Sequence, residues 1–260
     1  MQHMLSKAHI RLIRSLDTRK GRRTHRLFVA EGPKLVGELA GHFRCVYIAA
    51  TEAWATAQVA LFRAAAEADI VTPAELERAS LQQTPQEVIA LFQQPTYDTN
   101  PVTAMTTGLH IVLDNVQDPG NLGTIVRLAD WFGVHDVWCS LATADIWNPK
   151  AVQATMGALA RVRVHYINIA AVMAALPPTT PRYATALDGE PLWQAVLTSA
   201  GIIVMGNEGR GISDEVRRAC NRRLLIPNFP ASATAVESLN VGVATAIVLA
   251  EFRRRESNGS

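Results

Sequence analysis

The sequence lacks the features that mark several large classes of protein. No run of apolar residues approaches the roughly 20 that a membrane-spanning helix needs. The N-terminus is basic and has no apolar core of the kind found in signal peptides. The three cysteines are far apart and form no CxxC pair, so neither a disulfide framework nor a cysteine metal site is expected. These absences predict a reduced, cytoplasmic, metal-free protein outside the membrane.

What the chain does have is an ample apolar content and an uneven distribution of positive charge. With 260 residues, 48% of them apolar, it can form one or two domains with cores of their own. The net charge is only +2, yet residues 1–26 hold eight Lys or Arg against the single acid Asp17. The positive field is therefore concentrated at the N-terminus.

The basic stretch Thr18–Arg26 is a candidate nucleic-acid contact. Five of its nine residues are Arg or Lys, around Gly21, which we expect to be flexible. Such a stretch suits phosphate contacts without base readout, although a solvated loop would have the same composition. The preceding residues 6–16 are compatible with an amphipathic helix. The residues expected to contact RNA are Arg19, Lys20, Arg22, Arg23 and Arg26.

Strands and helices alternate along the first hundred residues, which predicts a small α/β domain over residues 1–97. The expected elements are a strand ending at Ala30, a helix from Pro33 to about Leu39, a strand over Cys45–Ala50, a long alanine-rich helix from about Glu52 through Ala68 capped by Thr51, a short helix from Pro73, and a strand over Val88–Gln94. A linker is expected over residues 98–108, because Pro95–Gly108 contains two prolines and five threonines and shows no apolar periodicity.

Residues 109–260 predict a second α/β domain built on a mostly parallel sheet. Apolar strands such as LHIVL, DVWCS and IIVM alternate with helical segments, and continuous apolar strands are typical of sheets covered on both faces. A helix over NPKAVQATMGALA is expected to be capped by Asn148. The last helix is apolar on nearly every side, which favours packing at the centre of the fold or against a second subunit.

Three blocks place glycines, asparagines and a few charges where an apolar strand gives way to a turn or helix. They are NVQDPGNLGTIVRLA (Asn115–Ala129), MGNEGRGIS (Met205–Ser213) and ESLNVGVATAIVLAE (Glu237–Glu251). Because α/β sheets bind ligands at strand ends, the blocks predict a site. The glycine-rich block has neither the GK[ST] of a phosphate-binding loop nor the GxGxxG order of a dinucleotide fold.

Single residues in these blocks also have structural interpretations. Arg127, six residues after Asn121, can face an anion, or it can pair with Asp130 or Asp118. Ser238 is expected to cap the last helix, a role that competes with catalysis for its hydroxyl. Asn240, in the first turn, has poor helix propensity, which favours a binding role.

Taken together and in this order, the three blocks resemble the SpoU (TrmH-type) family of RNA ribose 2′-O-methyltransferases, of the SPOUT class, over residues 109–252. The N-terminal unit, with TRKGRRTHRLFVAEGPKLV, resembles the ribosomal-protein-like substrate-binding domain that many members carry. The resemblance implies S-adenosylmethionine as methyl donor, a C-terminal trefoil knot, and a homodimer with the active site at its interface. It also implies ribosomal RNA rather than transfer RNA as the substrate.

The resemblance assigns roles by position. It implies a cofactor set of Gly206, Ile226 and Leu239, and an active-site set of Asn115, Arg127, Glu208, Ser238 and Asn240. Arginine scarcely gives up its proton, so we expect Arg127 to act as an electrostatic clamp, with Ser238 or water receiving the proton. Asn115 and Asn240 would orient groups, and Glu208 would orient Arg127 or an asparagine. The segment Asn228–Glu237 is longer than is usual in the family and lacks its common glycine.

Alternative functions stay open at this point. Within the same class they are a transfer-RNA 2′-O-methyltransferase and a SPOUT base methyltransferase. A catalytically silent RNA-binding protein would keep the same fold, and the succession of strand, glycine turn and helix also suggests a nucleotide-dependent oxidoreductase. The sequence does not identify the target RNA or the modified nucleotide.

Overall fold

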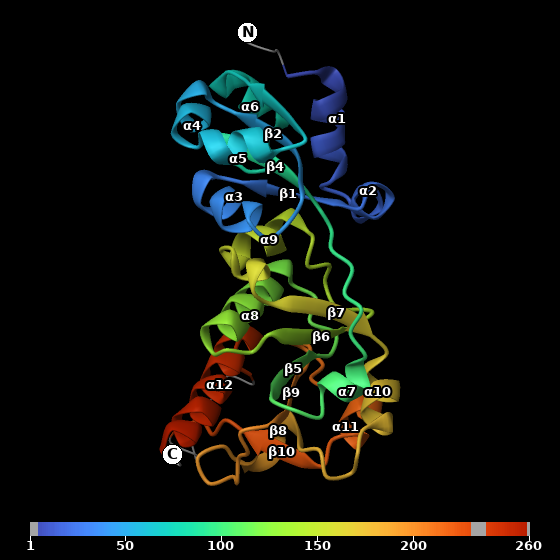
Figure 1. Cartoon of the computed structure of the whole chain (residues 1–260). Helices are drawn as coiled ribbons and strands as arrows, with labels where there is room; N and C mark the ends of the chain where they lie inside the picture. Colours follow the sequence, from blue (N-terminus) through green and yellow to red (C-terminus); the bar gives the residue numbers. More distant parts are fainter. Residues whose placement is uncertain (1–4, 230–237, 259–260) are drawn as a thin grey trace. The chain divides into compact units, whose positions relative to one another are not determined.

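The computed structural model describes residues 5–229 and 238–258, and the chain divides into two compact units (Figure 1). The first unit comprises Met1–Thr96 together with Asp145–Ala160, and the second comprises Tyr97–Ala144 and Arg161–Ser260. A segment from the middle of the chain thus packs with the N-terminal part. Within the described ranges, no helix has both the length and the apolarity to cross a membrane.

The first unit is built on a mixed sheet with the strand order β1-β4-β2-β3. β2 runs parallel to β3, and β4 is antiparallel to both β1 and β2. The strands are β1 (Leu27–Glu31), β2 (Cys45–Ala50), β3 (Glu67–Ile70) and β4 (Val88–Gln93). The helices are α1 (Lys7–Ser15), α2 (Arg19–His25), α3 (Pro33–Ala40), α4 (Glu52–Ala57), α5 (Val59–Ala64), α6 (Pro73–Ala79) and α9 (Pro149–Thr155), followed by a 3-10 turn at Ala158–Ala160. The expected small α/β unit is confirmed.

Two local expectations in this unit were wrong. The helix predicted from Glu52 to Ala68 is broken at Gln58, and its last residues form β3 instead. Pairing of β3 with the buried strand β2 outweighs the helix propensity of alanine there. The stretch around Gly21 is the helix α2, capped by Thr18, rather than a flexible loop. A Cβ atom at Gly21 would lie 2.0 Å from the carbonyl oxygen of Ser15, so glycine is needed for close packing.

An aromatic cluster holds the segment Asp145–Ala160 to the rest of the first unit. The ring of Trp147 lies 4.7 Å from that of Phe28, which stands on β1, and Phe43 contacts Phe28 edge to face at 5.2 Å. The side-chain amide of Gln82 also donates to Gln153 of α9, at 2.9 Å. Helix α9 therefore packs on β1 although more than a hundred residues separate them in the sequence.

The second unit is a parallel sheet with the strand order β10-β8-β9-β5-β6-β7, which confirms the predicted architecture. Its strands are β5 (Leu109–Leu113), β6 (Asp136–Ser140), β7 (Arg163–Ile167), β8 (Arg182–Pro191), β9 (Gly201–Met205) and β10 (Arg222–Leu225). β5 and β9 are buried along their whole length, as expected of strands covered on both faces.

Helices cover both faces of this sheet (Figure 1). α8 (Pro119–Trp131) packs with α12 (Val241–Asn258) on one side, while α7 (Pro101–Ala104), α10 (Ile169–Ala175) and α11 (Asp214–Arg218) lie on the other. The sequence analysis anticipated neither α10 nor α7, which lies within the expected linker over residues 98–108. The implied trefoil knot stays a prediction, because the connection from β10 to α12 runs through residues 230–237, outside the described residues.

A buried ionic cluster joins the starts of β6 and β7. Asp136, 6% exposed, accepts two hydrogen bonds from the Arg163 guanidinium at 2.8 and 2.7 Å. Its carboxylate is also 2.7 Å from Nε2 of His165, whose ring stacks on Trp138 with centroids 4.1 Å apart. Burial alone would raise the pKa of Asp136, but the hydrogen bonds from His165 and Arg163 lower that pKa to about 2. The charged carboxylate is therefore stabilised by the fold.

Candidate functional site

The three sequence blocks meet at one edge of the second unit's sheet. β5 and β9 are parallel neighbours, so the residues that follow them, Asn115 and Gly206, lie at the same carboxyl edge. β6 pairs with β5 on the other side and ends there at Ser140. This edge is where ligands bind in open α/β sheets.

Asn115 stands at a backbone position that few residues tolerate. Its φ of 60° is in the left-handed region, which asparagine enters more readily than most side chains. Its N–H donates to Ser140 Oγ at 3.0 Å, and its carbonyl accepts from Asn207 Nδ2 at 2.8 Å. Hydrogen bonds with the last residue of β6 and with the loop after β9 therefore fix the turn after β5. Sparsely populated backbone conformations held in this way often occur at functional sites.

The glycine-rich block forms a tight loop after β9. Asn207 and Gly211 exchange two backbone hydrogen bonds of 2.9 Å. Asn207 Oδ1 also accepts from the backbone N–H groups of Gly209 and Arg210, both at 3.0 Å. A Cβ atom on Gly206 would lie 2.3 Å from the carbonyl carbon of Gly211, so only glycine fits there. The loop is thus closed on itself and presents Glu208 at its tip.

A chain of side-chain hydrogen bonds joins the three blocks. Asn121, in the first turn of α8, donates through Nδ2 to Glu208 Oε1 at 3.0 Å. Its Oδ1 accepts from Asn240 Nδ2, also at 3.0 Å. Glu208 and Asn240 are thereby brought together through Asn121. The sequence analysis mentioned Asn121 only to locate Arg127 and gave it no role, although an asparagine in the first turn of a helix was the same signal that singled out Asn240.

Asn240 caps the last helix, and the expectation that Ser238 does so was wrong. Asn240 Oδ1 accepts from the backbone N–H of Gly242 at 2.9 Å and of Val243 at 3.3 Å, and α12 begins at Val241. The amide of Asn240 therefore has two functions, since its other end binds Asn121. Ser238 is exposed and its hydroxyl has no partner among the residues that the structure describes.

Arg127 lies exposed on α8 without the ion pairs that a structural role would require. Within residues 5–229 and 238–258 its side chain makes no hydrogen bond or salt bridge. Asp130, one of its expected partners, binds Arg161 instead, with a shortest distance of 2.8 Å. One turn further along α8, Trp131 is 83% exposed. The guanidinium of Arg127 is thus available to an external anion or to another chain.

The expected cofactor residues offer backbone groups and apolar side chains. Gly206 begins the closed loop, Ile226 is half-buried one residue after β10, and Leu239 is 45% exposed next to Asn240. Uncharged backbone and apolar groups of this kind suit the purine part of a nucleoside cofactor. The chemistry of this set therefore fits S-adenosylmethionine. The segment Asn228–Glu237, which is longer than is usual in the family, lies largely outside the described residues.

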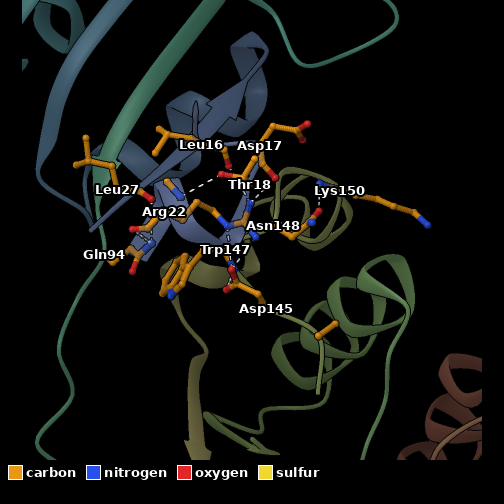
Figure 2. A network of polar contacts seen from close by, with 12 residues as sticks. Leu16, Asp17, Thr18, Arg22, Leu27, Gln94, Asp145, Trp147, Asn148 and Lys150 are labelled. Atoms are coloured by element: carbon orange, nitrogen blue, oxygen red, sulfur yellow. Dashed lines mark hydrogen bonds and ion pairs between the residues drawn. The ribbon is translucent and has the colours of Figure 1, made fainter. Parts of the chain in front are cut away.

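The five basic residues expected to contact RNA differ in how exposed they are. Arg19, Lys20, Arg23 and Arg26 are exposed, whereas Arg22 is 2% exposed. Figure 2 shows the Arg22 guanidinium between the carboxylate of Asp145 and the carbonyl oxygens of Leu16 and Asp17, each 2.8 Å away. All its nitrogens are engaged, so the expected RNA contact is revised for Arg22, which instead fixes α2 to residue 145.

No group of three or more His, Cys, Asp or Glu side chains in the described ranges is placed to hold a metal ion. The three cysteines are free thiols. Burial raises the pKa of Cys45 to about 11 and that of Cys220 to about 12, and it also raises the pKa of Cys139. Such thiols are poor nucleophiles near neutral pH.

Comparison with known proteins identifies relatives of both units. Residues 108–250 match the model of the SpoU rRNA methylase family, and residues 7–90 match that of the MRM3-like substrate binding domain. The 23S rRNA (guanosine(2553)-2′-O)-methyltransferase RlmP of Bacillus subtilis is 31% identical over 173 residues, 66% of each protein. The 23S rRNA (guanosine-2′-O-)-methyltransferase RlmB of Escherichia coli is 35% identical over 56% of this chain and 60% of that protein. The chain spans about half to two thirds of the length of the curated relatives it matches.

Solved structures are similar over nearly the whole chain. A TrmH-family protein from Porphyromonas gingivalis is 42% identical, with a TM-score of 0.84 over 97% of this chain and 100% of that one. An rRNA methyltransferase from Sinorhizobium meliloti with bound AdoMet is 26% identical, with a TM-score of 0.84 over 97% and 98% of the two chains. The likeness therefore extends to both units.

Proposed function

The chain belongs to the SpoU rRNA methylase family, and from this we propose that it transfers a methyl group from S-adenosylmethionine to a ribose 2′-hydroxyl of RNA. We propose ribosomal RNA as the substrate, since the relatives RlmP and RlmB are named as 23S rRNA methyltransferases. The observation that carries the proposal is the hydrogen-bonded chain from Glu208 through Asn121 to Asn240, which unites the three blocks at one sheet edge.

Gly206, Ile226 and Leu239 would hold the cofactor, largely through backbone groups. S-adenosylmethionine, when bound, supplies an electrophilic methyl group on its sulfonium. The protein's task is then positioning, because an in-line approach of the hydroxyl to that methyl group is an entropic requirement that a fixed site can meet. The closed loop at Gly206 and the strained turn at Asn115 provide fixed positions of this kind.

The polar residues would act on the ribose hydroxyl and its surroundings. Arg127 has no partner among the described residues and stabilises the developing alkoxide, or a neighbouring phosphate, as an electrostatic clamp. Ser238, whose hydroxyl is not needed as a cap, accepts a hydrogen bond from the ribose hydroxyl and passes its proton on to water, or water receives the proton directly. Glu208 acts by orienting Asn121, and Asn121 orients Asn240 in turn. Asn115 completes the set by orienting groups at the end of β5.

We further propose a homodimer formed through α8 and the start of α12. Trp131 is 83% exposed and Val243 is 51% exposed, and the two helices that carry them pack together. An exposed tryptophan beside an unpaired arginine is typical of an interface, since both residues are enriched there. A second copy would bring Arg127 to the active site of its partner. This arrangement explains why the Arg127 side chain has no hydrogen-bond or ion-pair partner among the described residues.

The first unit is proposed to bind RNA. Four exposed basic residues, Arg19, Lys20, Arg23 and Arg26, lie on and beside α2, and residues 7–90 match a substrate-binding domain. We extend the proposed domain of residues 1–97 by Asp145–Ala160, which pack with it. A cytoplasmic location follows from the proposed substrate.

The deciding experiment is methylation of ribosomal RNA with isotopically labelled S-adenosylmethionine, followed by mass spectrometry of the nucleosides. The label should appear on ribose as a 2′-O-methylnucleoside. A label on a base, or a label only when transfer RNA is supplied, would contradict the proposal in favour of another methyltransferase of this class. Absence of both transfer and cofactor binding would indicate a silent RNA-binding protein. Arg127→Lys should lose most activity and keep cofactor affinity, and near-normal turnover of this variant would refute the clamp.

A further inference from the structure

A polar cavity of about 460 Å³ opens beside the proposed methyl-transfer site, within the second unit. It lies between the turn after β5 and the closed loop after β9. Its lining consists of Asn115, Gln117, Ala142, Asn207, Arg210, Gly211 and Ser213. None of the three proposed cofactor residues lines it, so it is a separate compartment of the same sheet edge.

The cavity presents polar groups that the fold itself does not use. Among the described residues, the side chains of Gln117, Arg210 and Ser213 have no hydrogen-bond or ion-pair partner. Asn115 accepts from Ser140 through Oδ1, which leaves its Nδ2 unused. The local structure is nevertheless fixed, because Asn207 binds Asn115 on one side and the backbone of Arg210 on the other. The cavity is therefore a formed site with unused hydrogen-bonding capacity.

The chemistry of these groups points to an oxyanion. A guanidinium, two carboxamides and a hydroxyl can all donate hydrogen bonds, and none of the described residues that line the cavity carries a carboxylate. In the part of the chain that the structure describes, the lining has no aromatic ring and no aliphatic side chain larger than that of Ala142, so a base would find no stacking surface there apart from Arg210. Phosphate oxygens are recognised by such a combination of Arg, amide and hydroxyl donors.

We infer that this cavity binds a phosphodiester of the RNA backbone next to the methylated ribose, with Arg210 supplying the charge and Gln117 a neutral donor. The inference rests on the proposed function, since it places the phosphate beside the site of transfer. Asn207 connects the two places: it lies in the cavity wall, holds the carbonyl of Asn115, and precedes Glu208. Phosphate binding here would set the distance from the backbone to the ribose hydroxyl.

The test measures the affinity of the full-length protein for a short single-stranded RNA as a function of salt concentration. Arg210→Ala should weaken binding roughly tenfold or more at moderate salt, as expected for loss of a charge-assisted hydrogen bond. It should also reduce the slope of log affinity against log salt by about one, because one phosphate contact is lost. Gln117→Ala should weaken binding a few fold without changing the slope.

Arg218→Ala is the matched control. Arg218 is exposed at the end of α11, outside the cavity lining, and its replacement removes the same charge from the same unit. Both Gln117 and Arg210 are exposed, so their variants should fold normally. Affinity for S-adenosylmethionine, measured by calorimetry, should be the same in all three variants and the unaltered protein.

Three results would overturn the inference. One is an unchanged salt slope in Arg210→Ala, and another is an equal change in Arg218→Ala, which would indicate a diffuse field. The third is a loss of cofactor affinity in Arg210→Ala, which would assign the cavity to the carboxylate of the cofactor. RNA binding is measured without turnover, so the phosphate site is tested independently. Failure of the unaltered protein to methylate RNA would instead contradict the proposed function.

Discussion

Replacement of Arg22 by alanine tests whether this residue has a structural role or contacts RNA. In the folded protein its guanidinium is bound by Asp145 and by the carbonyl oxygens of Leu16 and Asp17. Arg22→Ala leaves the carboxylate and both carbonyls without this donor. Removing one member of a buried ion pair costs about 3–5 kcal/mol. Asp145 retains 16% exposure and can regain some hydration, so we expect about 3 kcal/mol.

The assay is urea unfolding followed by tryptophan fluorescence, combined with hydrogen exchange of the α2 amides, because the two units need not unfold as one. Trp147 reports on this region, since its backbone N–H donates to the second oxygen of Asp145 at 3.0 Å. Exchange in α2 should accelerate by roughly two orders of magnitude for a loss of about 3 kcal/mol. The double variant Arg22→Met, Asp145→Leu should recover most of the stability, because an apolar pair needs no hydrogen bonds.

Arg23→Ala is the matched control for this prediction. Arg23 is the next residue in α2 and is exposed, so its replacement should change stability by less than about 0.5 kcal/mol while weakening RNA binding. If Arg22→Ala were as stable as Arg23→Ala and lost RNA affinity to the same extent, the structural assignment would be refuted. Arg22 would then be an RNA contact after all.

Three further predictions concern the second unit. Gly206→Ala should abolish measurable binding of S-adenosylmethionine in calorimetry, because its Cβ would force the loop apart at Gly211; unchanged affinity would remove the loop from the cofactor site. The folded-state pKa of Asp136, about 2, lies below its ordinary value, so its stabilisation is present above about pH 4 and lost as the pH falls towards 2. Asp136→Asn should therefore lose roughly 2 kcal/mol of unfolding free energy at pH 6, and urea titrations at pH 6 and pH 3 should show a shallower acid dependence than in the unaltered protein. Trp131→Glu should give a monomer by analytical ultracentrifugation if α8 forms the dimer interface; a dimer that persists would place the interface elsewhere.

The parallel sheet was predictable because each of its strands can be recognised from its own short stretch of sequence. Strands such as β5 and β9 are continuous apolar runs, and each is followed by a residue with a local constraint: Asn115 has a left-handed φ that few side chains accept, and Gly206 has no room for a Cβ atom. The helix expected over Glu52–Ala68 failed for the opposite reason. Its ending depends on pairing with β2, which no local pattern reveals.

The sequence predicted the three blocks that form the site, but not the hydrogen bonds that join these blocks. Hydrogen bonds between Asn121 and Glu208, or between Asn240 and Asn121, join residues 87 and 119 positions apart, and sequence spacing cannot indicate them. The same holds for Arg22, whose partner Asp145 lies 123 positions away. Composition identified a basic stretch, whereas burial, which depends on the complete fold, decided which of its members can reach RNA.

The packing of Asp145–Ala160 with the first unit has a consequence for recombination. A gene exchange that replaced only residues 1–96 would leave behind Asp145, Trp147 and Gln153, which the structure shows bound to Arg22, Phe28 and Gln82. The two units are therefore not interchangeable modules in the manner of domains joined by a single linker. A hybrid with a new RNA-binding part would fold well only if the insert between β6 and β7 were transplanted along with it.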